Sequence, residues 1–326
     1  MAPVLEVSGL TTVFHTRTGM VRAVQDVSFS VEAGETLAIV GESGCGKTMT
    51  ALSLMRLIPM PPGEITAGSV KVAGTDLLTL DEASMRKMRG SQIAMIFQEP
   101  MTALNPLFTV GRQIAEMVSL HENVSRRVAN DRAVEMLQHV RIPAPERRAR
   151  EYPHQMSGGM RQRAMIALAL ACKPTVLLAD EPTTALDVTV QIQILLLLRQ
   201  LQEELGMAIV FVTHDVGAAA EISDRIAVMY AGRFVETGTT REVMRNPLHP
   251  YTQGLLSSTV HGGMRGRALE TIPGSPPDLA DLPPGCPFAP RCRYVVDACR
   301  QGDIPVVSTK TGAMARCVRA QERVAA

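Results

Sequence analysis

The sequence is poor in aromatic residues and contains no tryptophan, since phenylalanine and tyrosine together make up 3% of its 326 residues. A stacking surface for single-stranded nucleic acid needs several aromatic rings, so this composition argues against one. Charge of one sign is not in excess either, because the formal net charge is +1. Proteins that bind the nucleic acid backbone usually carry a basic surface. The composition therefore makes nucleic acid an unfavourable partner.

Long hydrophobic runs are also missing. The longest unbroken apolar stretch, Ala164 to Cys172, is far shorter than the roughly 18–20 residues that a helix needs to cross a bilayer. The first residues, Met1 to Glu6, lack the basic and apolar segments of a secretory signal peptide. We therefore expect a chain without membrane spans or signal peptide that is made and kept in the cytoplasm.

What the sequence does contain is a phosphate-binding motif. The stretch Gly41 to Thr48 follows the apolar run Thr36 to Val40 and precedes apolar residues at helical spacing. Strand, glycine loop and helix in this order are typical of a Walker A loop, whose backbone N–H groups and helix dipole bind a polyphosphate. Lys47 is predicted to reach the β- and γ-phosphates, and the Thr48 hydroxyl to bind Mg²⁺. The nucleotide-binding residues expected here are Gly41, Ser43, Gly44, Cys45, Gly46, Lys47 and Thr48.

Two acidic residues stand at the end of a second apolar run. Thr175 to Ala179 leads directly into Asp180 and Glu181. In a parallel α/β sheet, ligands gather at the carboxyl ends of the strands. Asp180 is therefore predicted to orient Mg²⁺ through water, and Glu181 to align or deprotonate the attacking water. An acidic turn without a catalytic role is the alternative, and the upstream phosphate loop argues against it.

Two further features could belong to the same site. His214 follows the apolar strand Ala208 to Thr213. A lone histidine usually has a structural role, but one at such a strand end beside a phosphate site can contact the γ-phosphate, which is the interpretation favoured here. Ser157, Gly158 and Gly159 precede an apolar helix expected over Ala164 to Cys172. Backbone N–H groups at that helix start could hold phosphate, although an N-cap followed by a flexible turn explains the same pattern.

Phe14 is expected in a polar loop between strands predicted at Leu5 to Leu10 and Val21 to Val31. An aromatic ring about 30 residues ahead of a phosphate loop either stacks on the nucleotide base or belongs to the core. The remaining pattern predicts strands at Gly68 to Val72, Ile93 to Phe97, Arg225 to Tyr230 and Arg233 to Val235, and a helix over Val188 to Leu205.

The chain changes character twice. From Leu107 to Tyr152 the apolar residues take helical spacing, which predicts a helical insert at about residues 107–160. Beyond Asn246 the composition shifts, and seven of the 21 prolines lie between Ile272 and Arg291, too many for regular elements. We therefore expect an α/β nucleotide-binding domain over residues 1–245 and a separate extension over residues 246–326.

The cysteines are concentrated in that extension. Within the last 41 residues, five, six and seventeen residues separate its successive members, which are Cys286, Cys292, Cys299 and Cys317. In a reducing compartment such a cluster indicates a metal centre before disulfides. A metal crosslink is physically reasonable here, because the appendage is too small to be held together by apolar burial alone. Four thiolates suit an iron-sulfur cluster and a structural Zn²⁺ equally well, and the spacing does not decide between them.

Six motifs in this order resemble the nucleotide-binding subunit of an ATP-binding cassette (ABC) transporter, and the likeness covers residues 5 to about 240. They are Gly41 to Thr48, Gln98, Ser157 to Gly159, Asp180 with Glu181, Thr184 to Asp187, and His214. Longer stretches look like the dipeptide, oligopeptide and nickel importer branch. These are Gly41 to Gly44, Gln98 to Pro106, Tyr152 to Met160, Asn246 to Thr252, and Gly285 to Cys292, the last typical of the branch's C-terminal extension.

The resemblance implies an α/β P-loop ATPase core with an inserted helical subdomain and a small Pro/Cys-rich C-terminal extension. It also implies that two cassettes close around two ATP molecules, each held between the Walker A loop of one subunit and Ser157, Gly158 and Gly159 of the other. Gln98 would sense Mg²⁺ and the attacking water, Asp187 would cross the interface, and His214 would hold the γ-phosphate. The four C-terminal cysteines are carried over as ligands of a [4Fe–4S] cluster.

In function, the resemblance implies the ATP-hydrolysing subunit of an importer for short peptides, peripheral on the cytoplasmic side of the inner membrane. Its partners would be a second ABC ATPase subunit, two transmembrane permease subunits and an extracytoplasmic solute-binding protein. The alternatives are nickel or another small solute as cargo, a soluble non-transport ABC ATPase, and a cysteine module that senses redox state or iron. Met160 and Thr184 depart from the broad family pattern, in which Gln and Ser are usual at these positions.

Overall fold

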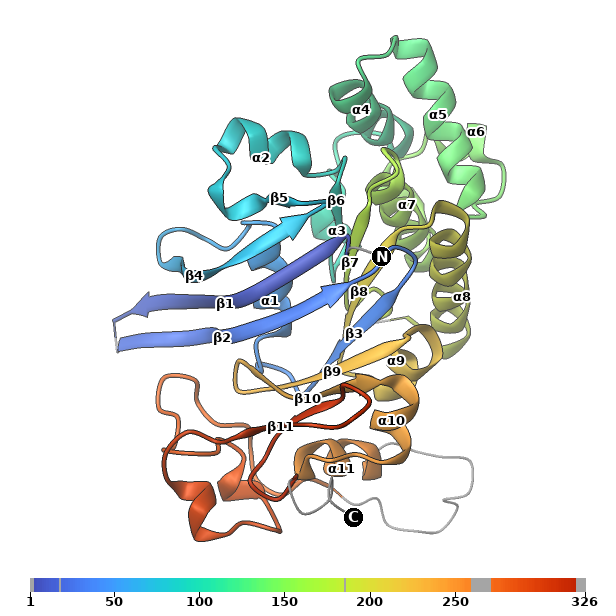
Figure 1. Cartoon of the computed structure of the whole chain (residues 1–326). Coiled ribbons are helices and arrows are strands. Elements are labelled where there is room, and N and C mark those ends of the chain that lie inside the picture. Colours follow the sequence, from blue (N-terminus) through green and yellow to red (C-terminus); the bar gives the residue numbers. More distant parts are fainter. Residues whose placement is uncertain (1–2, 18, 185, 259–270, 321–326) are drawn as a thin grey trace. The chain divides into compact units, whose positions relative to one another are not determined.

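The computed structural model describes residues 3–17, 19–184, 186–258 and 271–320 (Figure 1). The chain forms two compact units, each assembled from three separate stretches of sequence. The first comprises Met1–Glu6, Ser30–Glu35 and Lys71–Val210, and the second comprises Val7–Phe29, Thr36–Val70 and Phe211–Ala326. Over the described ranges, no helix has both the length and the apolar character that crossing a membrane would require.

In the first unit, strands β6 (Ile93–Ile96) and β7 (Val176–Asp180) pair in parallel, with Ile93 opposite Val176 and Ile96 opposite Ala179. Both strands are buried along their whole length. A parallel strand covered on both faces needs an uninterrupted apolar sequence, which is what both strands have. The unit also contains β5 (Thr75–Asp76) and the helices α2 (Glu82–Met88), α3 (Pro100–Ala103), α4 (Val110–Glu122), α5 (Arg126–His139), α6 (Pro145–Arg148), α7 (Gly158–Leu170) and α8 (Val188–Leu205).

Helices α4 and α5 pack against each other, and both contact α7. Ile114 and Val118 are buried on α4, and Ala133 and Leu137 are buried on α5, four residues apart in each case. This spacing places each pair on one helix face, so each helix has a single apolar stripe to bury. The helical spacing predicted between Leu107 and Tyr152 is confirmed, while the outer limits of the insert stay a prediction.

In the second unit, five strands are ordered β11-β12-β10-β9-β3. Strands β3 (Thr36–Val40) and β9 (Arg225–Tyr230) are parallel, whereas β10 (Arg233–Thr239), β12 (Met314–Arg316) and β11 (Val306–Ser308) continue the sheet by antiparallel pairing. The unit's helices are α1 (Lys47–Leu54), α9 (Val216–Ile222), α10 (Thr240–Arg245) and α11 (Pro250–Ser257). Four strands have residues in both units: β1 (Leu5–Thr16), β2 (Gly19–Val31), β4 (Gly63–Val72) and β8 (Ala208–Thr213).

Two local predictions are wrong. Strand β1 continues to Thr16, so Phe14 lies within a strand and not in a polar loop. Hydrogen bonds to a neighbouring strand can extend a strand through polar residues, even where apolar and polar residues do not alternate. Helix α7 begins at Gly158 and not at Ala164, because Ser157 caps it by accepting a hydrogen bond from the Met160 N–H at 3.3 Å.

The proline-rich segment has little regular structure, as predicted. Within residues 271–305, all of which the structure describes, the regular elements are two short 3₁₀ turns, Ala289–Arg291 and Asp297–Arg300. Proline fixes φ and lacks the N–H that helices and sheets use. The short strands β11 and β12, which the sequence pattern did not reveal, follow this segment.

Candidate active site

The predicted Walker A loop connects β3 to α1. Gly44 and Gly46 have φ values of +79° and +109°, in the left-handed region that favours glycine. Space is restricted as well: a Cβ atom on Gly46 would lie 2.4 Å from the Ala23 carbonyl oxygen, and one on Gly41 would lie 2.3 Å from the Met229 carbonyl oxygen. The loop therefore needs glycine both for its turn and for its close approach to neighbouring backbone.

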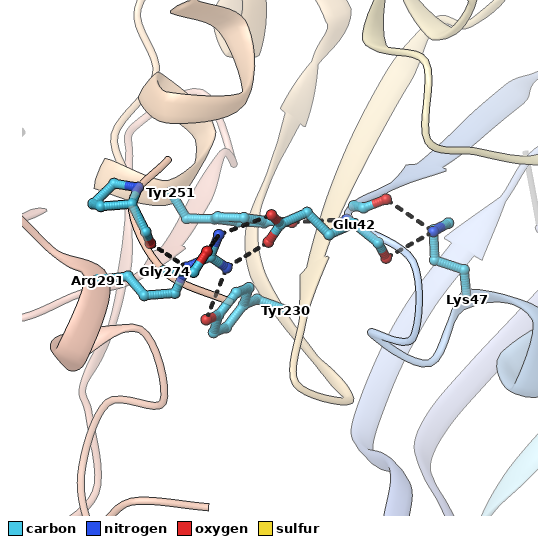
Figure 2. A network of polar contacts seen from close by, with 8 residues as sticks. Glu42, Lys47, Tyr230, Tyr251, Gly274 and Arg291 are labelled. Carbon is cyan, nitrogen blue, oxygen red and sulfur yellow. Dashed lines mark hydrogen bonds and ion pairs between the residues drawn. The ribbon is translucent and has the colours of Figure 1, made fainter. Parts of the chain in front are cut away.

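Lys47 is the first residue of α1, and only 4% of it is exposed. Its ammonium donates to the carbonyl oxygens of Gly41 at 2.8 Å and Glu42 at 3.0 Å (Figure 2). A buried ammonium needs such acceptors, and both belong to the loop itself. No side chain caps the first turn of α1, so the positive end of its dipole faces the loop. The loop thus combines a cation and a helix N-terminus, as phosphate binding requires.

Gln98 and Glu181 are brought together in the first unit. Gln98 follows β6 and Glu181 follows β7, and these two strands are parallel neighbours. The Gln98 Nε2 donates to the Glu181 Oε2 at 3.1 Å, and the Thr184 hydroxyl donates to the same oxygen at 2.9 Å. The carboxylate is therefore oriented by two donors at the strand ends, where ligands bind in parallel sheets.

The backbone of Glu181 is strained. Its φ is +44°, in the left-handed region that residues with a side chain rarely adopt. Such a conformation costs about 1–3 kcal/mol and persists only where the surrounding structure enforces it. The neighbouring Asp180 ends β7 and is only 2% exposed. The strain and the burial both indicate that these two carboxylates are held in place by the fold.

Ser157, Gly158, Gly159 and Asp187 face one hollow of the first unit. The other residues around it are Met160, Arg163, Leu186, Val190 and Gln193. Ser157 caps α7, so the capping interpretation of Ser157 holds in this structure. Asp187 also acts as a cap, because it accepts from the Val190 N–H of α8 at 2.9 Å. Ala185, which belongs to the same motif as Asp187, lies outside the described residues.

His214 and Phe14 belong to the second unit together with the Walker A loop. His214 is exposed directly after β8, where Asp215 caps α9 by accepting from the Gly217 N–H at 2.8 Å. Phe14 is half-buried, and its ring lies against Gly63, since a Cβ atom there would be 3.0 Å from Phe14 Cε1. Of the other predicted residues, Gln98, Asp180, Glu181, Asp187 and the segment Ser157 to Gly159 belong to the first unit.

The four C-terminal cysteines line one small cavity, together with residues that include His249, Phe288 and Ile304. None of these four cysteines is part of a disulfide. The pKa of the Cys286 thiol is raised to about 11, chiefly by burial and also by charge repulsion from the other three cysteines, against the lowering effect of a backbone hydrogen bond from Phe288. Among the residues that the structure describes, no three His, Cys, Asp or Glu side chains are grouped closely enough to bind one metal ion.

Two residues that the sequence did not link to the Walker A loop contact it in the structure. Arg291 forms an ion pair with Glu42 at 2.6 Å, and the Tyr251 hydroxyl accepts a hydrogen bond from the Glu42 N–H at 2.8 Å (Figure 2). Both residues lie in stretches that carried the importer resemblance, but no periodicity or spacing linked them to the loop.

Two family models match the chain. The one described as "ABC transporter" matches residues 24–184, and the one described as "Oligopeptide/dipeptide transporter, C-terminal region" matches residues 235–299. A putative peptide import ATP-binding protein of Brucella melitensis is 54% identical, with 98% of each chain covered. The oligopeptide transport ATP-binding protein OppD of Bacillus subtilis is 52% identical over 90% of this chain and 82% of its own length.

Solved structures agree with this assignment. A dimeric ATP-binding cassette in a post-hydrolysis state, bound to ADP and Pi, is 30% identical with a TM-score of 0.65, covering 73% of this chain and 99% of its own. A Clostridium perfringens cassette from the transporter complex cbiONQ has a TM-score of 0.64 at 24% identity, covers 76% of this chain and 92% of its own, and supports the fold alone. The chain therefore has the α/β fold of ABC P-loop ATPases and belongs to the ATP-binding subunits of the oligopeptide/dipeptide ABC transporter family.

Proposed function

We propose that this chain binds and hydrolyses ATP to power the import of short peptides through a membrane ABC transporter. The observation that carries this proposal is the match, at 54% identity over 98% of both chains, to a relative named as a putative peptide import ATP-binding protein. The OppD relative is named for oligopeptide transport, which favours peptides over nickel as cargo. Matches of this extent also favour a transporter subunit over a soluble non-transport ATPase.

In this proposal, different residues of the chain bind the phosphates and activate the attacking water. Lys47 and the N–H groups of the glycine loop hold the β- and γ-phosphates, and His214 contacts the γ-phosphate. Glu181 takes the proton from the attacking water, and Gln98, which donates to Glu181, helps to place that water.

Thr48, Gln98 and Asp180 would hold Mg²⁺, since a hydroxyl, an amide and a carboxylate oxygen are the ligands this ion prefers. When bound, Mg²⁺ neutralises the charge that develops on the phosphates. Phe14 would stack on the nucleotide base, and its contact with Gly63 leaves the core role open as the alternative.

The second half of the ATP site is proposed to come from another cassette. The hollow lined by Ser157, Gly158, Gly159 and Asp187 would accept the nucleotide held by the partner's Walker A loop. The dimeric cassette that matches this chain supports a paired arrangement. Loss of the γ-phosphate then removes the contact that favours the closed pair, and the pair opens.

We further propose that the chain acts at the cytoplasmic face of the inner membrane with two permease subunits, a second cassette and an extracytoplasmic solute-binding protein. Residues 1–245 would form the nucleotide-binding domain, with its helical insert at about residues 107–160, and residues 246–326 the extension.

This assembly is tested by extracting the tagged chain from its native membranes in mild detergent and identifying the co-purifying proteins by mass spectrometry. Two permease chains and a second cassette are expected, and an untagged strain is the control. Ribosomal or DNA-repair proteins without any permease would contradict the transport function. Uptake of a labelled dipeptide and of nickel is then compared between parent cells and cells that lack this chain. The solute whose uptake is lost in the cells without the chain is the cargo.

We also propose that Cys286, Cys292, Cys299 and Cys317 hold a [4Fe–4S] cluster, with structural Zn²⁺ as the alternative. The donor set suits either group chemically, because four thiols line one cavity and thiolates are ligands of both. Binding would have to draw the thiols together, since no three of these described side chains are grouped closely enough to bind one metal ion. A bound metal deprotonates its thiol ligands, which offsets the high pKa that burial gives Cys286. Such a centre would crosslink an extension that has little apolar core of its own.

Anaerobically purified protein is expected to contain about four iron and four sulfide ions per chain. Cys292→Ser should lower both contents and the melting temperature, because one ligand is lost. Cys172→Ser is the matched control, since Cys172 lies in the first unit and should leave both contents unchanged. Zinc without sulfide would exclude the iron-sulfur cluster.

A further inference from the structure

Within the second unit, Arg291 of the C-terminal extension forms a bidentate ion pair with Glu42 of the Walker A loop. The Arg291 Nη1 lies 2.6 Å from the Glu42 Oε2, and its Nη2 lies 2.9 Å from the Glu42 Oε1 (Figure 2). The Arg291 side chain is only 5% exposed and that of Glu42 is 25% exposed. A bidentate pair that is largely shielded from water is both stronger and more directional than a surface ion pair.

Glu42 is engaged through its backbone as well as its carboxylate. Its N–H donates to the Tyr251 hydroxyl at 2.8 Å, and its carbonyl oxygen accepts from the Lys47 ammonium at 3.0 Å. Arg291 and Lys47 are therefore connected through a single residue of the loop. Any displacement of Glu42 would disturb the acceptor that holds Lys47.

Arg291 is itself fixed by its surroundings. Its Nε donates to the Pro273 carbonyl at 2.8 Å, and its Nη1 donates to the Tyr230 hydroxyl at 3.3 Å. The Tyr230 ring packs edge-on against Phe288, with ring centroids 5.3 Å apart. The guanidinium thus occupies a preformed position in a packed aromatic cluster, so it can act as an anchor for the loop.

The charge of Glu42 explains why an anchor is needed. A carboxylate at the second position of a phosphate-binding loop repels the triphosphate that the loop must bind. Arg291 neutralises this carboxylate, which leaves the Lys47 charge and the α1 dipole to attract the nucleotide.

We propose that Arg291 is a positioning residue for ATP binding, which acts by holding and neutralising Glu42 of the Walker A loop. The inference rests on the proposed function, because the loop is the ATP site of that proposal. It gives the C-terminal extension a part in the chemistry of its own subunit, in addition to any metal that its cysteines bind.

The test is the equilibrium dissociation constant for ATP, measured on the full chain by competition with a fluorescent ATP analogue, together with the KM and kcat of ATP hydrolysis. R291M is expected to raise the dissociation constant and the KM about tenfold, the effect of losing one charge-assisted interaction, with kcat changed less than about twofold. The double variant E42Q/R291M is expected to return to within about threefold of the parent, because no unpaired carboxylate remains.

R293M is the matched control. Arg293 lies two residues further along, with its guanidinium 5.0 Å from the centre of the Tyr294 ring, and its loss should leave ATP affinity at the parent value. If R291M does not fold, R291Q replaces it with the same expectations, since its amide can still donate to the Pro273 carbonyl.

A folded R291M variant that melts earlier but binds ATP like the parent would overturn the proposal and leave Arg291 a purely structural role. A double variant as weak as R291M would overturn the charge argument. A parent chain that binds ATP without hydrolysing it would instead count against the proposed function, while the binding constants would still test the role of Arg291.

Discussion

Replacing Glu181 by glutamine is expected to lower the rate of ATP hydrolysis about 100- to 10,000-fold, the usual contribution of a general base. ATP binding should change little, because glutamine has the same size and its amide oxygen can still accept from Gln98 and Thr184. The variant should therefore bind ATP without turning it over, and a dimer with ATP bound should accumulate.

Phosphate release and ATP binding measured on the same preparation check this result. The matched control is Glu203→Gln, which changes an exposed glutamate that forms an ion pair with Arg199 one turn earlier on α8, at 3.5 Å. That control should hydrolyse ATP at the parent rate. Hydrolysis by Glu181→Gln at the parent rate would show that another group activates the water.

Replacing Lys47 by methionine is expected to weaken ATP binding by about 100-fold or more, because a shielded ammonium that contacts phosphate is lost. Methionine keeps most of the side-chain length but supplies no donor for the Gly41 and Glu42 carbonyls. The loop carbonyls lose their partner even without nucleotide, so a small loss of thermal stability should accompany the loss of affinity.

Titration with a fluorescent ATP analogue measures the affinity, and a melting curve confirms that the variant is folded. Lys87→Met is the control, since Lys87 is exposed near the end of α2 and should not affect binding. Parent-level affinity in a folded Lys47→Met variant would contradict the assignment of the phosphate loop. Together the Lys47 and Glu181 variants separate binding from hydrolysis.

The sequence predicted best the elements whose signal is local. Strands β8 and β9 have the bounds expected from their apolar runs. A strand buried on both faces is apolar along its length, so the ends of the apolar run mark the ends of the strand. Helix α8 has its expected bounds because Asp187 caps its start and Gly206 ends it in a left-handed conformation.

The elements that the sequence did not reveal depend on distant partners. Strands β11 and β12 contain three residues each, too few to show a period, and β12 pairs with β10, which lies 77 to 79 residues earlier at the paired positions. The extra length of β1 likewise comes from pairing, and it moved Phe14 from the expected loop into a strand.

The candidate site shows the same division. Its individual motifs were readable, and the rule for parallel strand ends explains why Gln98 meets Glu181. Nothing local predicts that Glu42 meets Arg291, because an ion pair between residues 249 positions apart leaves no periodic trace in the sequence. The strained backbone of Glu181 was equally hidden, since glutamate gives no sign of a left-handed turn.

The pairing of β10 with β12 has a consequence for shortened versions of this protein. A cassette cut back to residue 245 would lose the strand that covers β10 and would present an open row of backbone donors and acceptors. Such a row can recruit a strand from another molecule, so the shortened cassette should associate with itself or precipitate. The extension thus pairs with a strand that would otherwise lie at the edge of the sheet, and it also supplies the Arg291 side chain that contacts the phosphate loop.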